Sequence, residues 1–444
     1  MVALQDEIHG LLVAALAAEQ AHDWDLAICL YLRLRGTWGG DHRVIANLAS
    51  VCWYANRPFE ARKLYAESAV LAPGDPLPWR GLGNALRDCN RFEVADRAYA
   101  RSLALGDLPL TRWNRSQLLQ GLERYPEAYR LAEARFRHPG FEGYRPLSGH
   151  GPLIGPNQPP QLAIWTEQGF GDTLQYLRWC VSLPAQGLSE AQASGVVLEV
   201  EPCLERLVRL GLGWLASPPV VRSKSTIPEP LGPQGRHCSL LSLPHHFGGA
   251  PLPGVFEPTK RFGHWTGYLR SSAWPLVGSH RRPRIGLVWA AGRKLDDPFT
   301  AREYGKRTLP PETLASLIEG LHGQGAQLSN LQIGPDRDQA IPWADLFVDA
   351  LPAQANFADT ASWIRQLDLL ISVDTASAHL AGALGHPCWM LLPYSADPRW
   401  LRDRSDSPWY PSLRLFRQPQ TGQWSPVIEQ VISAFRPWWQ QASS

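Results

Sequence analysis

The chain of 444 residues has no long apolar run, almost no excess of charge of one sign and no closely spaced pair of cysteines. No segment approaches the ~20 consecutive apolar residues that a membrane-spanning helix needs. The 43 basic and 41 acidic residues leave a formal net charge of +2, which gives no reason to expect nucleic acid or an anionic membrane as a partner. We therefore expect a soluble protein.

The seven cysteines are odd in number and scattered, and none belongs to a Cys-x-x-Cys motif. Neither a disulfide framework nor a zinc site is indicated, and this usage is typical of the reducing cytosol. The pair His245-His246 has no cysteine or carboxylate at ligand spacing. We expect a cytoplasmic protein without a metal site.

Residues 1–137 contain an internal repeat with a spacing of 34 residues. Three alanines and three tyrosines share this register: Ala27, Ala61, Ala95, Tyr31, Tyr65 and Tyr99. These offsets are the tetratricopeptide pattern, in which small residues let two helices approach and an aromatic residue fills the gap to the next hairpin. The sequence predicts four hairpins, the last of which opens at Trp113, and assigns these positions to structure rather than catalysis.

Residues 138–160 are dense in proline and glycine, a composition that breaks regular elements, and we interpret them as a linker. Beyond them, short apolar runs such as Leu162–Trp165 alternate with helical stretches, which is typical of parallel sheets covered by helices. The alternation starts again at Arg284–Trp289. The sequence thus predicts two Rossmann-like domains, 161–280 and 281–444.

The stretch Ile371–Pro393 has the pattern of one strand–helix–strand unit. Asp374 falls where the first strand ends, Thr375 and Ala376 fall where the helix begins, and His379 follows one turn later. Unpaired backbone N–H groups and the positive end of the helix dipole would face the crevice at this edge of the sheet, so an anion could bind there. The alternative is that one of these residues merely caps the helix.

A second turn, Gln168–Asp172, follows the first predicted strand. It is not a dinucleotide-binding fingerprint, because Leu174 stands where the third glycine is required. We expect Gly169 and Gly171 to adopt positive φ, so that Asp172 opens a helix at the cleft. Its carboxylate could be the general base for an attacking hydroxyl or an ordinary helix cap, and the spacing alone leaves both open.

A basic pair, Lys306 and Arg307, precedes a predicted helix and follows a loop that begins at Gly292. A cation at this place could bind an anionic ligand. A solvated surface pair is the common alternative, and Arg293 and Lys294 compete for the same role.

These segments resemble the heptosyltransferase-like enzymes, the family 9 glycosyltransferases with a two-Rossmann-domain (GT-B) fold. Asp374–His379 is similar to their Asp-Thr-Gly-x-x-His segment, with Ala376 in place of the glycine. The turn that ends at Asp172 is similar to their Gly-Asp turn. Lys306–Pro310 is similar to their Arg-Lys-x-Trp-Pro segment, with Leu309 in place of the tryptophan.

The resemblance covers roughly residues 161–437 and implies inverting transfer of a sugar from a nucleotide-sugar donor, with no metal ion or other cofactor. It implies that Asp172 is the catalytic base. The residues that it assigns to donor binding are Lys306, Arg307, Asp374, Thr375, Ala376 and His379. The sequence Asp336-Arg337-Asp338 matches the Asp-x-Asp of metal-dependent glycosyltransferases formally, but we prefer a solvated surface turn.

The sequence therefore predicts an all-α tetratricopeptide superhelix followed by an α/β GT-B fold. In this hypothesis the repeats choose the acceptor, a glycan or a protein that offers a hydroxyl group. A hypothesis of a different class is a non-catalytic tetratricopeptide adaptor whose degenerate GT-B part binds a nucleotide or a glycan. Ala376 and Leu309, which depart from the family pattern, keep this alternative open.

Overall fold

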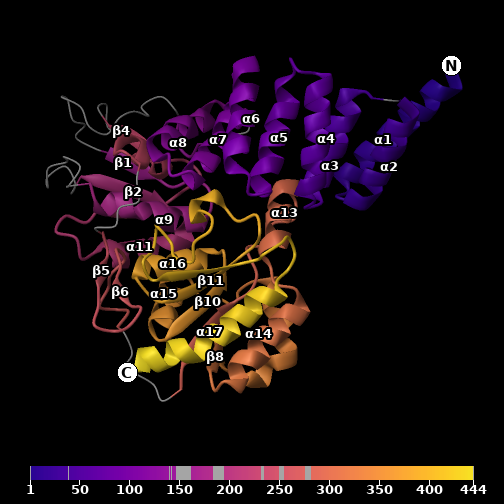
Figure 1. Cartoon of the computed structure of the whole chain (residues 1–444). Helices are drawn as coiled ribbons and strands as arrows, with labels where there is room; N and C mark the ends of the chain where they lie inside the picture. The colour runs from indigo at the N-terminus through magenta and orange to yellow at the C-terminus, as the bar shows by residue number, and fades with distance from the viewer. Residues whose placement is uncertain are drawn as a thin grey trace. The chain divides into compact units, whose positions relative to one another are not determined.

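The computed structural model describes residues 2–38, 40–139, 141, 143–146, 162–183, 195–231, 235–249, 255–275 and 282–443 (Figure 1). The chain divides into two compact units. The repeat unit comprises Met1–Pro139, Lys294–Lys306 and Ser395–Arg402. The sheet unit comprises Gly140–Arg293, Arg307–Tyr394 and Asp403–Ser444. Most of the predicted linker 138–160 lies outside the described residues.

Helical hairpins build the N-terminal part of the repeat unit, where consecutive helices pack in pairs (Figure 1). The helices are α1 (Val2–Gln20), α2 (Trp24–Trp38), α3 (His42–Tyr54), α4 (Pro58–Leu71), α5 (Pro76–Asp88), α6 (Phe92–Leu105), α7 (Pro109–Gly121) and α8 (Tyr125–Ala132), followed by the 3₁₀ helix η1 (Glu133–Arg137). A Cβ atom on Gly83 would lie only 2.5 Å from Cε1 of Tyr99, so the small residue makes room for the ring. The tetratricopeptide architecture is confirmed.

The first sheet of the sheet unit has four parallel strands in the order β3-β2-β1-β4. The strands are β1 (Leu162–Trp165), β2 (Val196–Val200), β3 (Val220–Ser223) and β4 (Arg236–Ser239). The connecting elements are α9 (Phe170–Val181), α11 (Pro202–Leu212), η3 (Leu240–Ser242), α12 (Leu243–His246) and the hairpin of β5 (Glu257–Pro258) and β6 (Trp265–Thr266).

The second sheet has six parallel strands in the order β12-β11-β10-β7-β8-β9. The strands are β7 (Arg284–Val288), β8 (Gln327–Asn330), β9 (Phe347–Ala350), β10 (Leu369–Val373), β11 (Cys388–Leu392) and β12 (Leu413–Arg417). The intervening elements are α13 (Pro298–Arg307), α14 (Pro311–Gly323), η5 (Pro335–Leu346), α15 (Phe357–Arg365), α16 (Ala376–Leu384), η6 (Pro398–Trp400) and α17 (Ser425–Ser443). Both sheets are of the α/β class, as predicted.

The central strands β10 and β11 have the bounds that their apolar runs predict, and every residue in them is buried. Helices cover both faces of a parallel sheet, so its central strands are continuously apolar and easy to detect. The edge strands β3 and β9 lack such runs because they are largely half-buried or exposed, and the sequence did not predict them. The prediction of a loop between Gly292 and the basic pair is wrong in part, because the residues from Pro298 onward form the helix α13.

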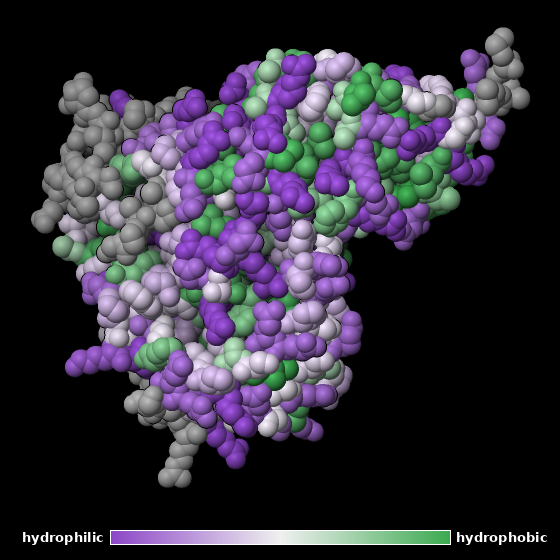
Figure 2. Space-filling model, in the orientation of Figure 1, coloured by the Kyte–Doolittle hydropathy of each residue, from purple (hydrophilic) through white to green (hydrophobic). Residues whose placement is uncertain are grey.

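None of the helices in the described residues is long and apolar enough to cross a lipid bilayer. Figure 2 shows apolar residues interspersed with hydrophilic ones on the visible surface of the repeat helices. Large exposed apolar side chains of the first hairpin include Val13, Leu16, Leu26 and Leu32.

Candidate functional site

The candidate site lies within the sheet unit, at the carboxyl ends of strands from both sheets. The strand order reverses between β1 and β4 in the first sheet and between β7 and β10 in the second. Open parallel sheets bind ligands outside the carboxyl ends of the strands at such reversals. The turn after β1 leads into α9, the turn after β10 leads into α16, and these two helices pack against each other.

Gly171 and His379 mark the point where the two turns meet. A Cβ atom on Gly171 would lie 2.8 Å from Cδ2 of His379 and 3.3 Å from its Nε2. Such a contact is closer than a side chain allows, so glycine is required for the approach. The turn of the first sheet and the helix of the second are therefore in direct contact.

The expectation that Gly169 and Gly171 adopt positive φ is wrong. Gly169 has a φ of −81° and Gly171 lies inside α9, whereas the residue with positive φ is Gln168 at 64°. The helix begins earlier than predicted, at Phe170, so the sharp turn precedes both glycines. A non-glycine residue in this conformation is strained by roughly 1–3 kcal/mol, and such strain often occurs at functional sites.

Asp172 is the third residue of α9, and its Oδ2 accepts a hydrogen bond from the backbone N–H of Gly169 at 3.1 Å. The carboxylate thus satisfies a backbone donor at the start of the helix, as a capping residue does. The side chain is only partly buried. Capping is therefore observed, while the role of Asp172 as a base stays a prediction.

Asp374, Thr375 and Ala376 lie at the start of α16, where the sequence predicts a helix start. The helix begins at Ala376, and Thr375 precedes it in extended conformation. The Oδ1 atom of Asp374 lies 3.7 Å from Nε2 of His379. Arg307 donates a hydrogen bond from Nη1 to the backbone carbonyl of Asp374 at 3.2 Å. The structure therefore brings these five predicted residues together.

Lys306 is adjacent to Arg307 in the chain but does not share its partner. Its Nζ lies 2.8 Å from Oε1 of Glu303, and both residues belong to the repeat unit. Burial lowers the pKa of the Lys306 amine, although the charge of Glu303 opposes this shift. Of the basic pair, Arg307 contacts the Asp374 turn and Lys306 pairs with Glu303.

Tyr410 holds the other side of the His379 ring. Its hydroxyl lies 2.9 Å from Nδ1 of His379, and both side chains are buried. Sequence analysis did not identify the contact of Tyr410 with the histidine. No local signal could have revealed this contact, because the two residues lie on segments that only the fold brings together.

A second carboxylate, Glu167, follows β1 and was also missed. It is buried, and its Oε1 accepts a hydrogen bond from the hydroxyl of Ser239, the last residue of β4. Glu167 therefore lies at the reversal point of the first sheet. Its position two residues beyond the strand end is the signal that could have identified it.

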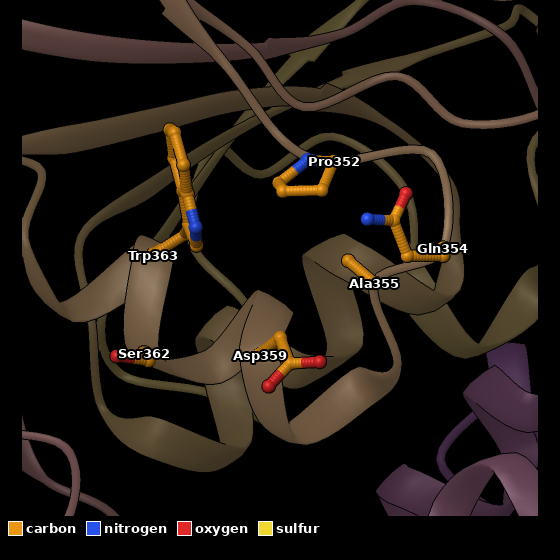
Figure 3. A pocket seen from close by; sticks show the side chains of 6 residues that line it. All are labelled: Pro352, Gln354, Ala355, Asp359, Ser362 and Trp363. Carbon is orange, nitrogen blue, oxygen red and sulfur yellow. The ribbon is translucent and has the colours of Figure 1, made fainter.

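A pocket of about 290 Å³ opens between the loop after β9 and helix α15 (Figure 3). The side chains that line it belong to Pro352, Gln354, Ala355, Asp359, Ser362 and Trp363. Figure 3 shows the indole of Trp363 across the open space from Gln354, with Pro352 above and Asp359 below. The pocket combines a planar aromatic wall with a carboxylate, a hydroxyl and an amide.

Phe170 connects the β1 turn to the start of α15. Its ring makes an edge contact with Phe357, the first residue of α15, with the ring centroids 5.4 Å apart. Asp359 is held on two sides, because Oδ2 accepts from the backbone N–H of Asn356 at 3.2 Å and Oδ1 pairs with Arg206 at 2.8 Å. The pocket is therefore adjacent to the helix start that Phe170 contacts.

Within the described residues, no group of three or more His, Cys, Asp or Glu side chains could hold a metal ion. Asp336 of the Asp-x-Asp sequence is buried and accepts a hydrogen bond from Nε2 of Gln339 at 2.9 Å. Asp338 is exposed, but the expectation of a solvated surface turn is wrong for Asp336.

No protein-family model matches the sequence. Protein FlbA of Caulobacter vibrioides is 31% identical over 409 aligned residues, which cover 84% of this chain. The chain spans 63% of the length of that relative.

Among solved structures, the tetratricopeptide domain of Sgt2 from Aspergillus fumigatus is 18% identical, with a TM-score of 0.26 over 31% of this chain and 87% of that one. The MamA protein, known from a crystal structure, is 15% identical in sequence, with a TM-score of 0.28 over 29% of this chain and 72% of that one. The assignment of the repeats rests on the hairpins described above and not on these scores.

Proposed function

We propose that this protein is a glycosyltransferase that moves a sugar from a nucleotide-sugar donor to a hydroxyl acceptor. The observation that carries the proposal is the contact between Gly171 and His379, since it joins a carboxylate-bearing turn of one sheet to a helix start of the other. Glycosyl transfer needs both a base for the acceptor and a cradle for the diphosphate.

The start of α16 and Arg307 would hold the donor diphosphate. The first backbone N–H groups of a helix have no partner within the helix and attract anions. The Arg307 guanidinium reaches the carbonyl of Asp374, immediately before this helix start. A fixed cation at this point would stabilise the charge of the departing nucleoside diphosphate.

The pocket beside Trp363 would hold the nucleoside of the donor. Its volume of about 290 Å³ is just below the ~300–1,000 Å³ typical of small-molecule sites. A planar base can stack on an indole, and Gln354 offers an amide donor and acceptor for a base edge. The Phe170–Phe357 contact supports a single ligand that extends from this pocket to the Asp172 turn.

Asp172 would act as the base that takes the proton from the acceptor hydroxyl, with inversion at the anomeric carbon. Glu167, at the end of the same strand, is the competing carboxylate. The repeats would choose the acceptor, because stacked helical hairpins present an extended concave surface that commonly binds partners.

A second candidate function is a non-catalytic adaptor that binds a nucleotide or a glycan. The observations that favour it are the capping bond of Asp172 and the engagement of Lys306 by Glu303, because each gives a predicted site residue a structural role. In this case the site would bind a nucleoside diphosphate without cleaving a sugar nucleotide.

Calorimetric titration with ADP, GDP, UDP and CDP tests the binding site. One nucleoside diphosphate should bind wild type, and Arg307→Met and His379→Asn should each weaken binding by ~1–3 kcal/mol, the range for a hydrogen bond to a charged group. Arg436→Met, an exposed arginine of α17, is the matched control. Failure of all four nucleotides to bind would refute the transferase and the nucleotide-binding adaptor, and would leave only an adaptor that binds a glycan.

Hydrolysis of the sugar nucleotide that corresponds to the bound diphosphate separates the two functions. Slow release of free sugar by wild type supports the transferase. Binding without any release, even with a hydroxyl acceptor present, supports the adaptor and overturns the transferase.

A further inference from the structure

We propose that Arg178, a buried cation of helix α9, is a positioning residue that acts through Tyr410 on the ring of His379. It keeps the imidazole neutral, with its proton on Nε2, the nitrogen that faces Asp374 before the start of α16. The consequence for ligand binding rests on the proposed function, whereas the state of the ring does not.

Arg178 is a buried charge without a counter-ion. Its side chain is inaccessible to solvent, and its Nε donates to the backbone carbonyl of Gln175 at 2.9 Å. Neither Nη atom meets an acceptor in good hydrogen-bond geometry, and no carboxylate among the residues that the structure describes pairs with the side chain. A guanidinium stays charged in proteins, and an unpaired buried charge is costly. Because an apolar side chain of similar size would pack here without this cost, the charge indicates a role beyond packing.

Aromatic rings surround the guanidinium instead. The distances from its Cζ atom to the ring centroids lie between 4.9 and 5.7 Å, and the rings belong to Tyr410, Trp409, Tyr268 and Phe256. The faces of such rings attract a cation within about 6 Å. Tyr410 is the nearest of the four. The cation is therefore held where it acts on the Tyr410 phenol.

The Tyr410 phenol contacts both the cation and the imidazole. Helix α16 fixes its position, because a Cβ atom on Gly382 would lie 2.4 Å from Cγ of the tyrosine ring. The rings of Tyr410 and His379 meet at 76°, with their centroids 5.7 Å apart. The hydroxyl lies 2.9 Å from Nδ1 of His379. The charge of Arg178 thus reaches the histidine through one aromatic ring.

The proton of the Tyr410 hydroxyl can go to His379 or to the oxygen of Tyr268. Burial raises the pKa of Tyr268, and contacts with Arg178 and Tyr410 oppose this shift. The Tyr268 hydroxyl itself donates to the carbonyl of Leu174 at 2.6 Å. A cation weakens a neighbouring oxygen as an acceptor and strengthens a neighbouring phenol as a donor. Both effects direct the Tyr410 proton to Nδ1 of His379.

The surroundings of the other ring nitrogen agree with this assignment. Nε2 of His379 lies 3.7 Å from Oδ1 of Asp374, and a carboxylate favours the N–H on the nitrogen that faces it. A neutral imidazole has one donor and one acceptor nitrogen. With Nδ1 as the acceptor, the single proton of the ring is on Nε2.

Other charged residues face this group from α9, from the end of α13 and from the end of β12, and they are Asp172, Arg307 and Arg417. The two carboxylates, Asp172 and Asp374, favour a second proton on the ring. The three guanidinium groups oppose it, since like charges disfavour each other. Arg178 differs from the other two in acting through the Tyr410 hydroxyl.

A neutral His379 donates a hydrogen bond from Nε2 and adds no charge to the start of α16. A diphosphate bound there would be held by Arg307 and by backbone N–H groups, whatever the pH near neutrality. Loss of the Arg178 charge lets the ring take up a second proton, which converts a neutral donor into a charged one. A hydrogen bond from a charged donor is roughly twice as strong. Without Arg178, diphosphate affinity therefore depends on the protonation of His379.

Nitrogen-15 spectra of the histidine rings in the full-length protein test the state of the ring without a ligand. The chain has 13 histidines, and the signals that disappear in His379→Asn identify His379. In wild type Nε2 should carry the proton, and Nδ1 should show the shift of a hydrogen-bonded acceptor. In Arg178→Met the ring should take up its second proton at a pH higher by about one unit, the effect of one nearby charge. An unchanged titration would overturn the proposal.

Tyr410→Phe tests the path of the effect, because it keeps the ring and removes only the hydroxyl. It should also raise the pH at which His379 takes up a proton. Arg178→Met should then add less in this background than in wild type, since residues that act through one contact are not additive. Equal effects in both backgrounds would overturn the role of the hydroxyl. Arg436→Met, an exposed arginine of α17, is the control and should leave the His379 signals unchanged.

Denaturant unfolding separates this role from a structural one. Methionine resembles arginine in length and removes an unpaired buried charge, so the unfolding free energy of Arg178→Met should stay the same or rise. A clear loss of stability together with an unchanged titration of His379 would mean that the charge serves packing, and would refute the inference. Tyr410→Phe retains the aromatic cage and provides the same titration if Arg178→Met does not fold.

Calorimetric titration with inorganic pyrophosphate tests the consequence for binding. At about pH 6, Arg178→Met should bind pyrophosphate about ten-fold more tightly than wild type, because its His379 is charged. At about pH 8 the two proteins should bind equally, and in the His379→Asn background the substitution should have no effect at either pH. Equal affinities at both pH values would overturn the binding part. If pyrophosphate does not bind wild type, the proposed donor site fails, while the spectra still decide the state of the ring.

Discussion

The imidazole of His379 occupies the space that a methyl group on Gly171 would need, because a Cβ atom there would lie 2.8 Å from Cδ2 of the ring. The ring cannot easily yield, since Tyr410 holds Nδ1 at 2.9 Å and the side chain is buried. This pair joins the turn of the first sheet to the helix of the second, and it gives the first test of the site.

Gly171→Ala should destabilise the protein by ~1–3 kcal/mol, the usual cost of overpacking a closed contact. Gly169→Ala is the matched control, because its φ of −81° suits alanine and its Cβ would meet only Oδ2 of Asp172 at 3.3 Å. Denaturant unfolding of the three proteins measures the difference. Equal stability of both variants would contradict the packing argument.

Asp172→Asn should lower sugar transfer by ~10²–10⁴, as expected for the loss of a general base. The asparagine oxygen can still accept from the Gly169 N–H, so stability should change little. Initial rates with saturating donor provide the measurement. Glu167→Gln is the comparison, and a larger loss in that variant would transfer the role of base to Glu167.

Trp363→Leu should weaken binding of the nucleoside diphosphate by ~1–3 kcal/mol, the value of stacking one base on an aromatic ring. Affinity for inorganic pyrophosphate should stay the same, since the indole belongs to the pocket and not to the start of α16. Trp343→Leu, on η5, is the control. An equal loss for both ligands would mean that the pocket does not hold the nucleoside.

Stability should fall as the pH decreases from about 6.5 towards 3, because of a buried histidine pair. His264 and His386 make an edge contact at 5.0 Å between their centroids. Burial, followed by the charges of Arg261 and Arg365, lowers the pKa of His264 to about 3. The unfolded chain takes up the proton near the ordinary value of 6.5 and the folded protein does not, so acid favours unfolding in this window.

His264→Phe keeps a ring at this position and removes the titrating group. The slope of the unfolding free energy against pH should then decrease by up to ~1.4 kcal/mol per pH unit, the value for one proton. Chemical unfolding at several pH values between 3.5 and 6.5 provides the comparison. His322→Gln, on the exposed side of α14, should leave the slope as in wild type.

Local patterns in the sequence were sufficient for the repeats and for the central strands. The register of Ala27, Ala61 and Ala95 gives the hairpins, and the fully apolar runs of β10 and β11 give their bounds. The first signal is a repeat along the chain and the second is a continuous apolar run, so both can be recognised without tertiary information. The family resemblance of the Gln168–Asp172 and Asp374–His379 segments also identified two turns that the structure places in contact through Gly171 and His379.

The sequence by itself determined the repeat period, the central strands β10 and β11 and the helix start at Thr375 and Ala376, because each depends on neighbours in the chain. Only the tertiary structure decided that Gly171 serves a close approach to His379, and that Arg307 reaches the carbonyl of Asp374. These contacts depend on which distant segments share a surface. Folding chooses that surface through the packing of whole helices and sheets, which no local pattern encodes.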